Sequence, residues 1–133
     1  ENFFVTNCDI IVSCDYNNIF EFHKKNKNSI TIVASIKKYI IPYGDCKVSK
    51  NGILKKINEK PEINLLANTG MYLMNKNVLK HIPKNEKYDL TNFIKKLLSK
   101  KIKIGVFPIS EESWIDVGEW NEYKKSISKL EGN

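Results

Sequence analysis

The segment that decides the fold is Phe3-Phe4-Val5-Thr6-Asn7-Cys8-Asp9-Ile10-Ile11-Val12, a nearly continuous apolar run with one polar interruption. Such a run predicts a strand that is buried on both faces and ends in a polar tip around Asp9. A strand of this kind needs neighbours on both sides. We therefore expect further strands beside it, some of them supplied by sequence that precedes residue 1.

Helical and strand patterns alternate along the rest of the chain, without an internal repeat or a convincing linker. Asp15 is placed to cap a first helix, and Asp89 to cap another whose apolar residues recur with the spacing of one helix face. Asn75 is placed to cap a short helix that ends before Pro83. The expected helices cover residues 16–27, 75–82, 90–98 and 119–130.

The strand patterns are short and rich in β-branched residues. Asn51-Gly52 is the strongest hairpin signal in the chain and joins two of them. The expected strands cover residues 30–36, 43–48, 53–58, 69–74 and 103–109, and residues 114–118 are expected to form a polar-tipped turn. Helices that alternate with strands predict an α/β domain with a mainly parallel sheet, covered on both faces, and one antiparallel hairpin.

The composition excludes several classes of protein. A length of 133 residues with 41% hydrophobic and 28% charged residues indicates one globular domain. No apolar run approaches the roughly 20 residues that a membrane span needs. The net charge of +7 comes from 22 lysines without one arginine, and scattered lysines solvate a surface rather than read bases. Three cysteines and two histidines form no zinc-type pair and no disulfide framework. Taken together, these observations lead us to expect a soluble, cytoplasmic protein without a nucleic-acid or membrane partner.

Two aspartates are the first candidates for a functional site. Asp9 follows an apolar strand, and Asp116 lies inside the apolar segment Trp114–Gly118. An apolar setting is a poor place for a lone charge, and Mg²⁺ held by one or two carboxylates and by substrate phosphates would supply a partner. Each aspartate could instead cap a turn or a helix through its own backbone contacts, and spacing alone slightly favours this simpler interpretation.

Other candidates are glycines and one charged pair. Gly44 and Gly70 would let the backbone approach a ligand closely, or would serve turns and strand packing. Glu59 and Lys60 place an anion and a cation side by side before a rigid proline, and on a strand they would point to opposite faces. One could then bind hydroxyls and the other phosphate, although a solvated charge pair is the simpler interpretation.

Six short motifs are distributed over almost the whole chain, between residues 5 and 118. They are Val5-Thr6-Asn7-Cys8-Asp9, Ile41-Pro42-Tyr43-Gly44, Glu59-Lys60-Pro61, Asn68-Thr69-Gly70-Met71-Tyr72, Tyr88-Asp89-Leu90-Thr91 and Trp114-Ile115-Asp116-Val117-Gly118. In this order they resemble the sugar-phosphate nucleotidylyltransferase family, and the match is nearest to mannose-1-phosphate guanylyltransferase-like proteins of polysaccharide synthesis.

The resemblance implies a three-layer α/β/α Rossmann-like nucleotidyltransferase fold and a reaction that joins a sugar 1-phosphate to a nucleoside triphosphate, with release of pyrophosphate. It assigns Mg²⁺ to Asp9 and Asp116 and the phosphate of the sugar to Lys60. It assigns sugar contacts to a further set, namely Gly44, Glu59, Asn68, Thr69 and Gly70.

The glycine-rich loop with which the family grips the triphosphate has no counterpart here, since the chain contains no arginine and no adjacent glycines. Residues 1–133 are therefore expected to be the latter, sugar- and metal-binding portion of a catalytic domain truncated at its N-terminus, inactive alone, with an exposed sheet edge that could pair with another copy. The alternatives are a non-catalytic sugar-phosphate-binding or regulatory relative and, more remotely, a basic nucleic-acid module.

Overall fold

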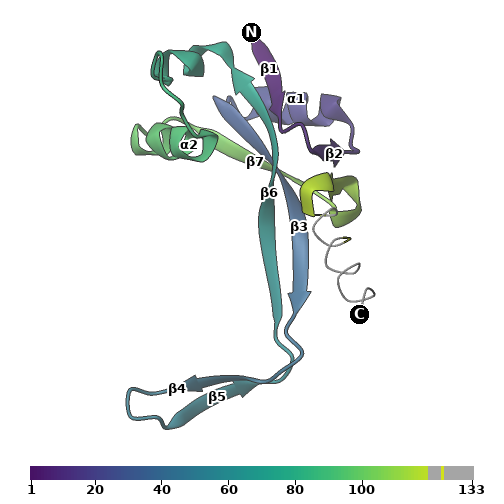
Figure 1. The fold of residues 1–133 in the computed structure, drawn as a ribbon, viewed down its shortest axis with the longest axis vertical. Helices are drawn as coiled ribbons and strands as arrows, with labels where there is room; N and C mark the ends of the chain where they lie inside the picture. The colour runs from purple at the N-terminus through teal and green to yellow at the C-terminus, as the bar shows by residue number, and fades with distance from the viewer. Residues whose placement is uncertain (120–123, 125–133) are drawn as a thin grey trace.

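The computed structural model describes residues 1–119 and 124. Its centre is a four-stranded sheet in the order β1-β6-β3-β7, which helices α1 and α2 cover on opposite faces (Figure 1). The sheet strands are β1 (Asn2–Thr6), β3 (Ile30–Ile40), β6 (Glu62–Asn75) and β7 (Ile104–Ile109); the helices are α1 (Tyr16–Lys25) and α2 (Leu90–Ser99).

Side chains along β6 point alternately to the two faces of the sheet. Met71 and Leu73 pack with Ile19 of α1, while the intervening positions face the other layer. There Tyr72 and Met74 pack with a cluster from α2 that consists of Phe93, Ile94 and Leu97. The three-layer α/β/α architecture is confirmed.

The capping predictions are confirmed at all three positions. The side chain of Asp15 accepts a hydrogen bond from the backbone of Asn17, and that of Asp89 accepts one from Asn92. Asn75 caps the short helix η1 (Lys76–His81), which is a 3₁₀ helix. Each aspartate or asparagine satisfies an N–H group that the first turn leaves without a partner.

The first predicted strand is wrong in one respect, because the run from Phe3 to Val12 forms two strands. β1 ends at Thr6, and β2 (Ile10–Val12) leaves the central sheet to pair with β8 (Trp114–Asp116), where a turn was expected. The break falls at the polar residues between them: the backbone N–H of Asn7 donates to Gly70, and residues 8 and 9 form a turn.

The central sheet is mixed, which corrects the expectation of a mainly parallel one. β3 and β7 run parallel, whereas β6 is antiparallel to both β1 and β3. The hairpin explains the direction of β6, since a short excursion returns the chain beside β3 in the opposite sense. The predicted hairpin is confirmed as β4 (Asp45–Val48) and β5 (Leu54–Asn58).

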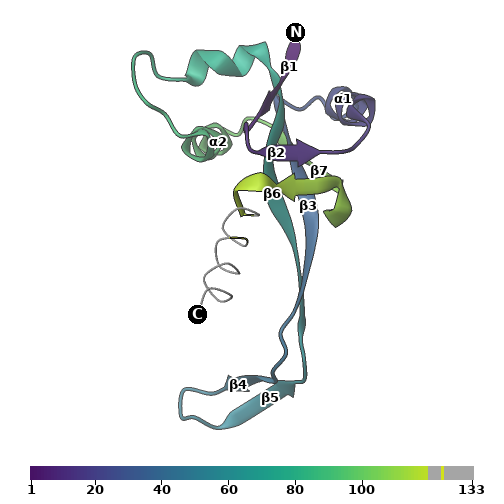
Figure 2. The ribbon, with the colours of Figure 1, turned by 45° about the vertical axis from the view of Figure 1, so that its right-hand side comes forward.

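The largest departure from prediction is a projecting arm, defined as residues 36–66. β3 and β6 extend beyond the central sheet as a two-stranded ribbon, in which Ile36–Ile40 pair with Glu62–Leu66, and the β4–β5 hairpin lies at its far end (Figures 1 and 2). The remaining described residues are called the body. A bulge between Val33 and Ala34 lies just before the arm begins.

The last predicted helix, residues 119–130, lies outside the described residues except at positions 119 and 124. None of the helices in the described part of the chain combines the length and apolar character that a membrane span requires.

Candidate functional site

The short β2–β8 sheet places Asp9 and Asp116 side by side, although 106 residues separate them in the sequence. Ile10 pairs with Asp116 across the two strands, and the backbone N–H of Val117 donates to the carbonyl of Asp9 at 2.8 Å. Both aspartates therefore lie at the same end of this sheet. The separation of β2 from β1, which the sequence did not predict, is what makes this arrangement possible.

The two carboxylates both lie close to Gly118. A Cβ atom placed on Gly118 would be 3.2 Å from Oδ1 of Asp116 and 3.4 Å from Oδ2 of Asp9. A side chain at this position would occupy the space beside both carboxylates. Glycine leaves that space open.

Asp116 also caps the helical turn that follows it, as the alternative interpretation of this aspartate predicted. Its Oδ1 accepts hydrogen bonds from the backbone N–H groups of Gly118 at 2.9 Å and Glu119 at 3.2 Å. These contacts fix the orientation of the carboxylate and use one of its two oxygens. Capping and metal binding are thus compatible at Asp116.

The donor set fits Mg²⁺ rather than a transition metal. Mg²⁺ is bound by one or two carboxylates and completes its octahedron with water and substrate phosphates. Within the described residues, no group of three or more His, Cys, Asp or Glu side chains is arranged to hold a metal. Asp9 and Asp116 would therefore hold the ion only together with ligands that a substrate brings.

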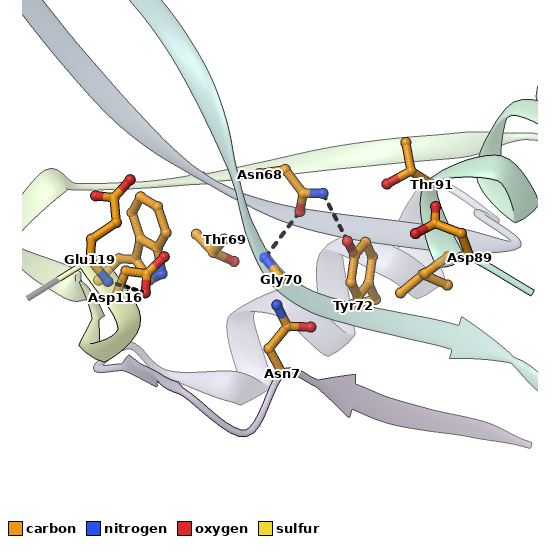
Figure 3. A pocket seen from close by; sticks show the side chains of 11 residues that line it. Asn7, Asn68, Thr69, Gly70, Tyr72, Asp89, Thr91, Asp116 and Glu119 are labelled. Atoms are coloured by element: carbon orange, nitrogen blue, oxygen red, sulfur yellow. Dashed lines mark hydrogen bonds between the residues drawn. The ribbon is translucent and has the colours of Figure 1, made fainter. Parts of the chain in front are cut away.

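A pocket of about 420 Å³ begins at Asp116 and crosses the C-terminal part of β6 to the start of α2. Its volume is within the usual range for small-molecule sites. Figure 3 shows its lining with Asp116 and Glu119 at one end, Asp89 and Thr91 at the other, and the Asn68–Tyr72 segment between them. The lining consists of Asn7, Asn68, Thr69, Gly70, Tyr72, Asp89, Leu90, Thr91, Trp114, Asp116 and Glu119.

Hydrogen bonds hold the middle of the pocket in one arrangement. Nδ2 of Asn68 donates to the hydroxyl of Tyr72 at 2.8 Å, and its Oδ1 accepts from the backbone of Gly70 (Figure 3). Gly70 has φ +85°, and a Cβ there would lie 2.5 Å from Nδ2 of Asn7. Both the backbone conformation and the close approach of Asn7 therefore require glycine.

Thr69 lines the pocket, but its hydroxyl is bonded to the protein itself. Oγ1 donates to the carbonyl of Val33 at 2.8 Å and accepts from the backbone of Met71 at 3.2 Å. Trp114 is the opposite case, because its buried indole N–H has no hydrogen-bond partner in the structure. Buried polar atoms are usually hydrogen-bonded, and this indole N–H is one of the exceptions in the described part of the chain.

Three of the predicted site residues lie elsewhere. Gly44, Glu59 and Lys60 are in the arm and do not line the pocket. They lie together, since Oε2 of Glu59 is 3.2 Å from the position of a Cβ on Gly44. The structure thus gathers the predicted residues into two groups, one in the body and one at the far end of the arm.

The charge of the pocket follows from its lining. Asp89, Asp116 and Glu119 contribute three carboxylates, and no lysine or histidine is among the lining residues. The only charged side chains that a phosphate dianion would meet among these lining residues are carboxylates. Binding of a phosphate at this place therefore requires a cation from outside the lining.

Several pocket residues were not selected as site residues from the sequence. Asp89 and Thr91 belong to a motif that supported the resemblance, yet only the folded chain shows that the start of α2 meets β6. Asn7 likewise belongs to one of these motifs, whereas Glu119 carried no local signal that separated it from solvated polar residues. The others in this group are Tyr72, Leu90 and Trp114.

Comparison with known proteins gives one family. The family model described as "Nucleotidyl transferase" matches residues 1–133. "Probable mannose-1-phosphate guanylyltransferase 3" of Oryza sativa subsp. japonica is 30% identical over 127 residues, which are 92% of this chain and 34% of that protein. The "UTP--glucose-1-phosphate uridylyltransferase" of Synechocystis sp. is 25% identical over 132 residues, 93% of this chain and 34% of that protein.

A catalytic beta subunit of mannose-1-phosphate guanylyltransferase from Drosophila pseudoobscura pseudoobscura is 31% identical over 84 residues, 62% of this chain and 23% of that protein. The chain thus spans 23–34% of the length of these curated relatives. Among solved structures, HddC from Yersinia pseudotuberculosis superimposes with a TM-score of 0.63 at 21% identity, over 97% of this chain and 55% of that chain. At this identity the likeness concerns the fold.

Proposed function

The chain belongs to the nucleotidyl transferase family, and on that premise we propose that its pocket binds the sugar of a sugar 1-phosphate for transfer to a nucleoside triphosphate. In that reaction a phosphate oxygen of the sugar 1-phosphate attacks the α-phosphorus of the triphosphate in line. A bond from that oxygen to phosphorus forms, and pyrophosphate leaves. The observation that carries the proposal is the meeting of Asp9 and Asp116 at Gly118, beside the pocket.

Asp9 and Asp116 are the residues that would hold Mg²⁺. When bound, the ion supplies positive charge against the phosphate oxygens. The backbone hydrogen bonds to Oδ1 of Asp116 orient its carboxylate before substrate arrives. Orientation of this kind reduces the reorganisation that the reaction would otherwise need.

The rest of the pocket would orient the sugar. Asn68 and Tyr72 form a hydrogen-bonded pair, and the exposed Asp89 and Thr91 offer oxygen atoms at the opposite end to Asp116. Carboxylate, amide and hydroxyl groups match the alternating donors and acceptors of sugar hydroxyls. No covalent nucleophile is needed, because positioning two reactants supplies much of the rate enhancement in such transfers.

Mannose 1-phosphate and GTP are the proposed substrates. Support comes from the guanylyltransferases of rice and fly among the relatives, while the Synechocystis relative makes glucose 1-phosphate and UTP the natural comparison pair. The whole reaction is proposed for the longer protein of which this chain would form the sugar- and metal-binding portion.

The experiment measures pyrophosphate release by the longer protein with Mg²⁺, testing each nucleotide with each sugar 1-phosphate. We expect turnover with mannose 1-phosphate and GTP, and little or none from residues 1–133 alone. Binding of a sugar 1-phosphate without pyrophosphate release from any pair would instead identify a non-catalytic, sugar-phosphate-binding relative.

A further inference from the structure

The net charge of the chain is concentrated in one segment. Residues 76–103 contain nine lysines and two acidic residues, which give a net charge of +7. The whole chain has 22 lysines and 15 acidic residues, so the other 105 residues carry 13 of each and are neutral together. Residues 76–103 are therefore named the basic segment.

The fold places the basic segment on one side of the sheet. Val78 of η1 and Phe93 of α2 belong to the same core cluster, on the face opposite α1 (Figures 1 and 2). Nζ of Lys96 donates to the carbonyl of His81 at 3.2 Å. Nζ of Lys100 lies 3.4 Å from Nδ1 of the same histidine. The lysines of α2 thus reach η1, and the two helices contribute to one surface.

The positive charge of this surface is not neutralised within the described part of the chain. Lys76 forms an ion pair with Glu1, and none of the other eight lysines of the segment is paired there with a carboxylate. The pKa of His81 is lowered by partial desolvation first and then by three nearby ammonium groups, of which that of Lys100 contributes most. Like charges held this close repel one another, and an anionic partner would reduce that repulsion.

Exposed aliphatic side chains lie among the lysines. Leu79 is 42% exposed, Ile82 is 39% exposed and Leu98 is 54% exposed. Leu98 follows Lys95 by three residues in α2, a spacing that places helix side chains next to one another. Leu79 follows Lys76 by the same interval in the 3₁₀ helix η1. The surface therefore combines positive charge with apolar side chains.

The residue types of the segment select among anionic partners. Protein interfaces are enriched in arginine and aromatic residues and depleted of lysine. Sequence readout in nucleic acids favours the planar fork of arginine, and single strands stack on exposed rings. The segment has no arginine, and its two aromatic residues, Tyr88 and Phe93, pack against each other. Lysines with aliphatic neighbours instead match a bilayer whose headgroups are anionic.

We propose that the basic segment binds the surface of a bilayer that contains anionic lipids. The lysine ammonium groups contact the headgroups, and the exposed aliphatic side chains of the helices enter the boundary with the acyl chains. This inference departs from the expectation of no membrane partner, which treated the lysines as scattered. None of the nine lysines lines the pocket, so the inference does not rest on the proposed function.

The test is flotation of the chain with vesicles of phosphatidylcholine, either pure or mixed with phosphatidylserine. We expect binding to the mixed vesicles, little binding to the pure ones, and loss of binding between about 0.05 and 0.5 M salt. Equal binding to both kinds of vesicle, or to neither, would overturn the proposal. Binding to an RNA homopolymer or to polyglutamate in place of the mixed vesicles would also overturn it, in favour of a nucleic acid or an acidic protein.

A pair of double variants locates the binding surface. Lys80→Gln combined with Lys95→Gln should lower the partition constant for mixed vesicles about 25-fold, since each lysine near an anionic surface contributes about fivefold. Lys55→Gln combined with Lys56→Gln removes the same charge from exposed positions of the arm and should leave the constant nearly unchanged. Equal losses would show a response to net charge alone and contradict the assigned surface.

A leucine pair separates the bilayer from a soluble anion. Leu98→Gln should lower the partition constant about fivefold, because it removes an apolar side chain from the boundary while helix propensity changes little. Leu54→Gln is the matched control, since Leu54 is 56% exposed in the arm. Circular dichroism verifies that both variants keep the fold. Equal partition constants for the two would leave charge as the only cause of binding and overturn the choice of a bilayer.

Discussion

The body and the arm use the same kinds of residues to opposite effect. In the body, Ile19, Ile30 and Leu97 are fully buried between sheet and helices. In the arm, Tyr43, Ile53 and Ile57 are 75%, 67% and 60% exposed. Burial of apolar area is the main source of folding free energy, so these residues of the body contribute to stability far more than the exposed residues of the arm.

The chemistry is divided in the same way. The body carries the carboxylates and amides of the pocket, whereas residues 43–60 of the arm contain five lysines and two acidic residues. The comparison teaches that the two regions differ in charge as well as in burial. The variants described next test the two regions separately.

Leu97→Ala should have the largest effect, because it opens a cavity in the core beneath α2. We expect a loss of about 2–5 kcal/mol in the free energy of unfolding. Ile57→Ala in the arm is the matched deletion and should change it by no more than about 0.5 kcal/mol. Urea unfolding followed by circular dichroism measures both, and a similar loss for the two would show that the arm is packed as tightly as the body.

Asp116→Asn in the longer protein should lower turnover about 100-fold or more, because it removes a carboxylate from the reacting phosphates. The amide oxygen can still accept from Gly118 and Glu119, so stability should be nearly unchanged. Asp15→Asn is the control, since Asp15 caps α1 away from the pocket. Unaltered pyrophosphate release by the Asp116 variant would remove the assigned role.

A change of pH should have the smallest of these effects on the free energy of unfolding. The histidine concerned, His23, lies in the body. His23 is buried, and its Nδ1 lies 2.8 Å from the hydroxyl of Thr31. Burial lowers the pKa of His23 below its ordinary value. The unfolded chain therefore binds more protons between the lowered and the ordinary pKa, and stability falls as pH drops through about 6.5.

His23→Gln should reduce the dependence of the free energy of unfolding on pH, measured by urea unfolding between about pH 7.5 and 5. The pKa of His81 is also lowered, by partial desolvation first and then by the charges of Lys100, Lys80 and Lys96. Salt screens that second contribution, so the remaining slope of the His23→Gln variant should shrink at high ionic strength. An unchanged slope in His23→Gln would assign the dependence to other groups.

Local features of the fold were predictable from the sequence, and long-range pairings were not. Asp15, Asn75 and Asp89 cap helices because the cap needs only the side chain and the next few residues. The separation of β2 from β1 depends on β8, about 100 residues away, and no local pattern records it. The first half of β6 was likewise not predicted as a strand, although polar and apolar residues alternate from Glu62 to Leu65.

The site shows the same division. Asp9 and Asp116 were selected by their apolar surroundings, and the structure brings them together; their metal-binding role stays a prediction. The grouping of Gly44, Glu59 and Lys60 away from the pocket depends on how β3 pairs with β6. That pairing is a tertiary property, which residue spacing alone does not contain.

The most direct test of the central claim is paramagnetic broadening of amide signals by Mn²⁺, used as a probe for the Mg²⁺ site. If Asp9 and Asp116 hold one divalent ion, the signals of residues 9 and 116–118 should broaden first, and either Asp9→Asn or Asp116→Asn should abolish the selectivity. Broadening that begins instead at the arm, or that neither variant alters, would contradict the account.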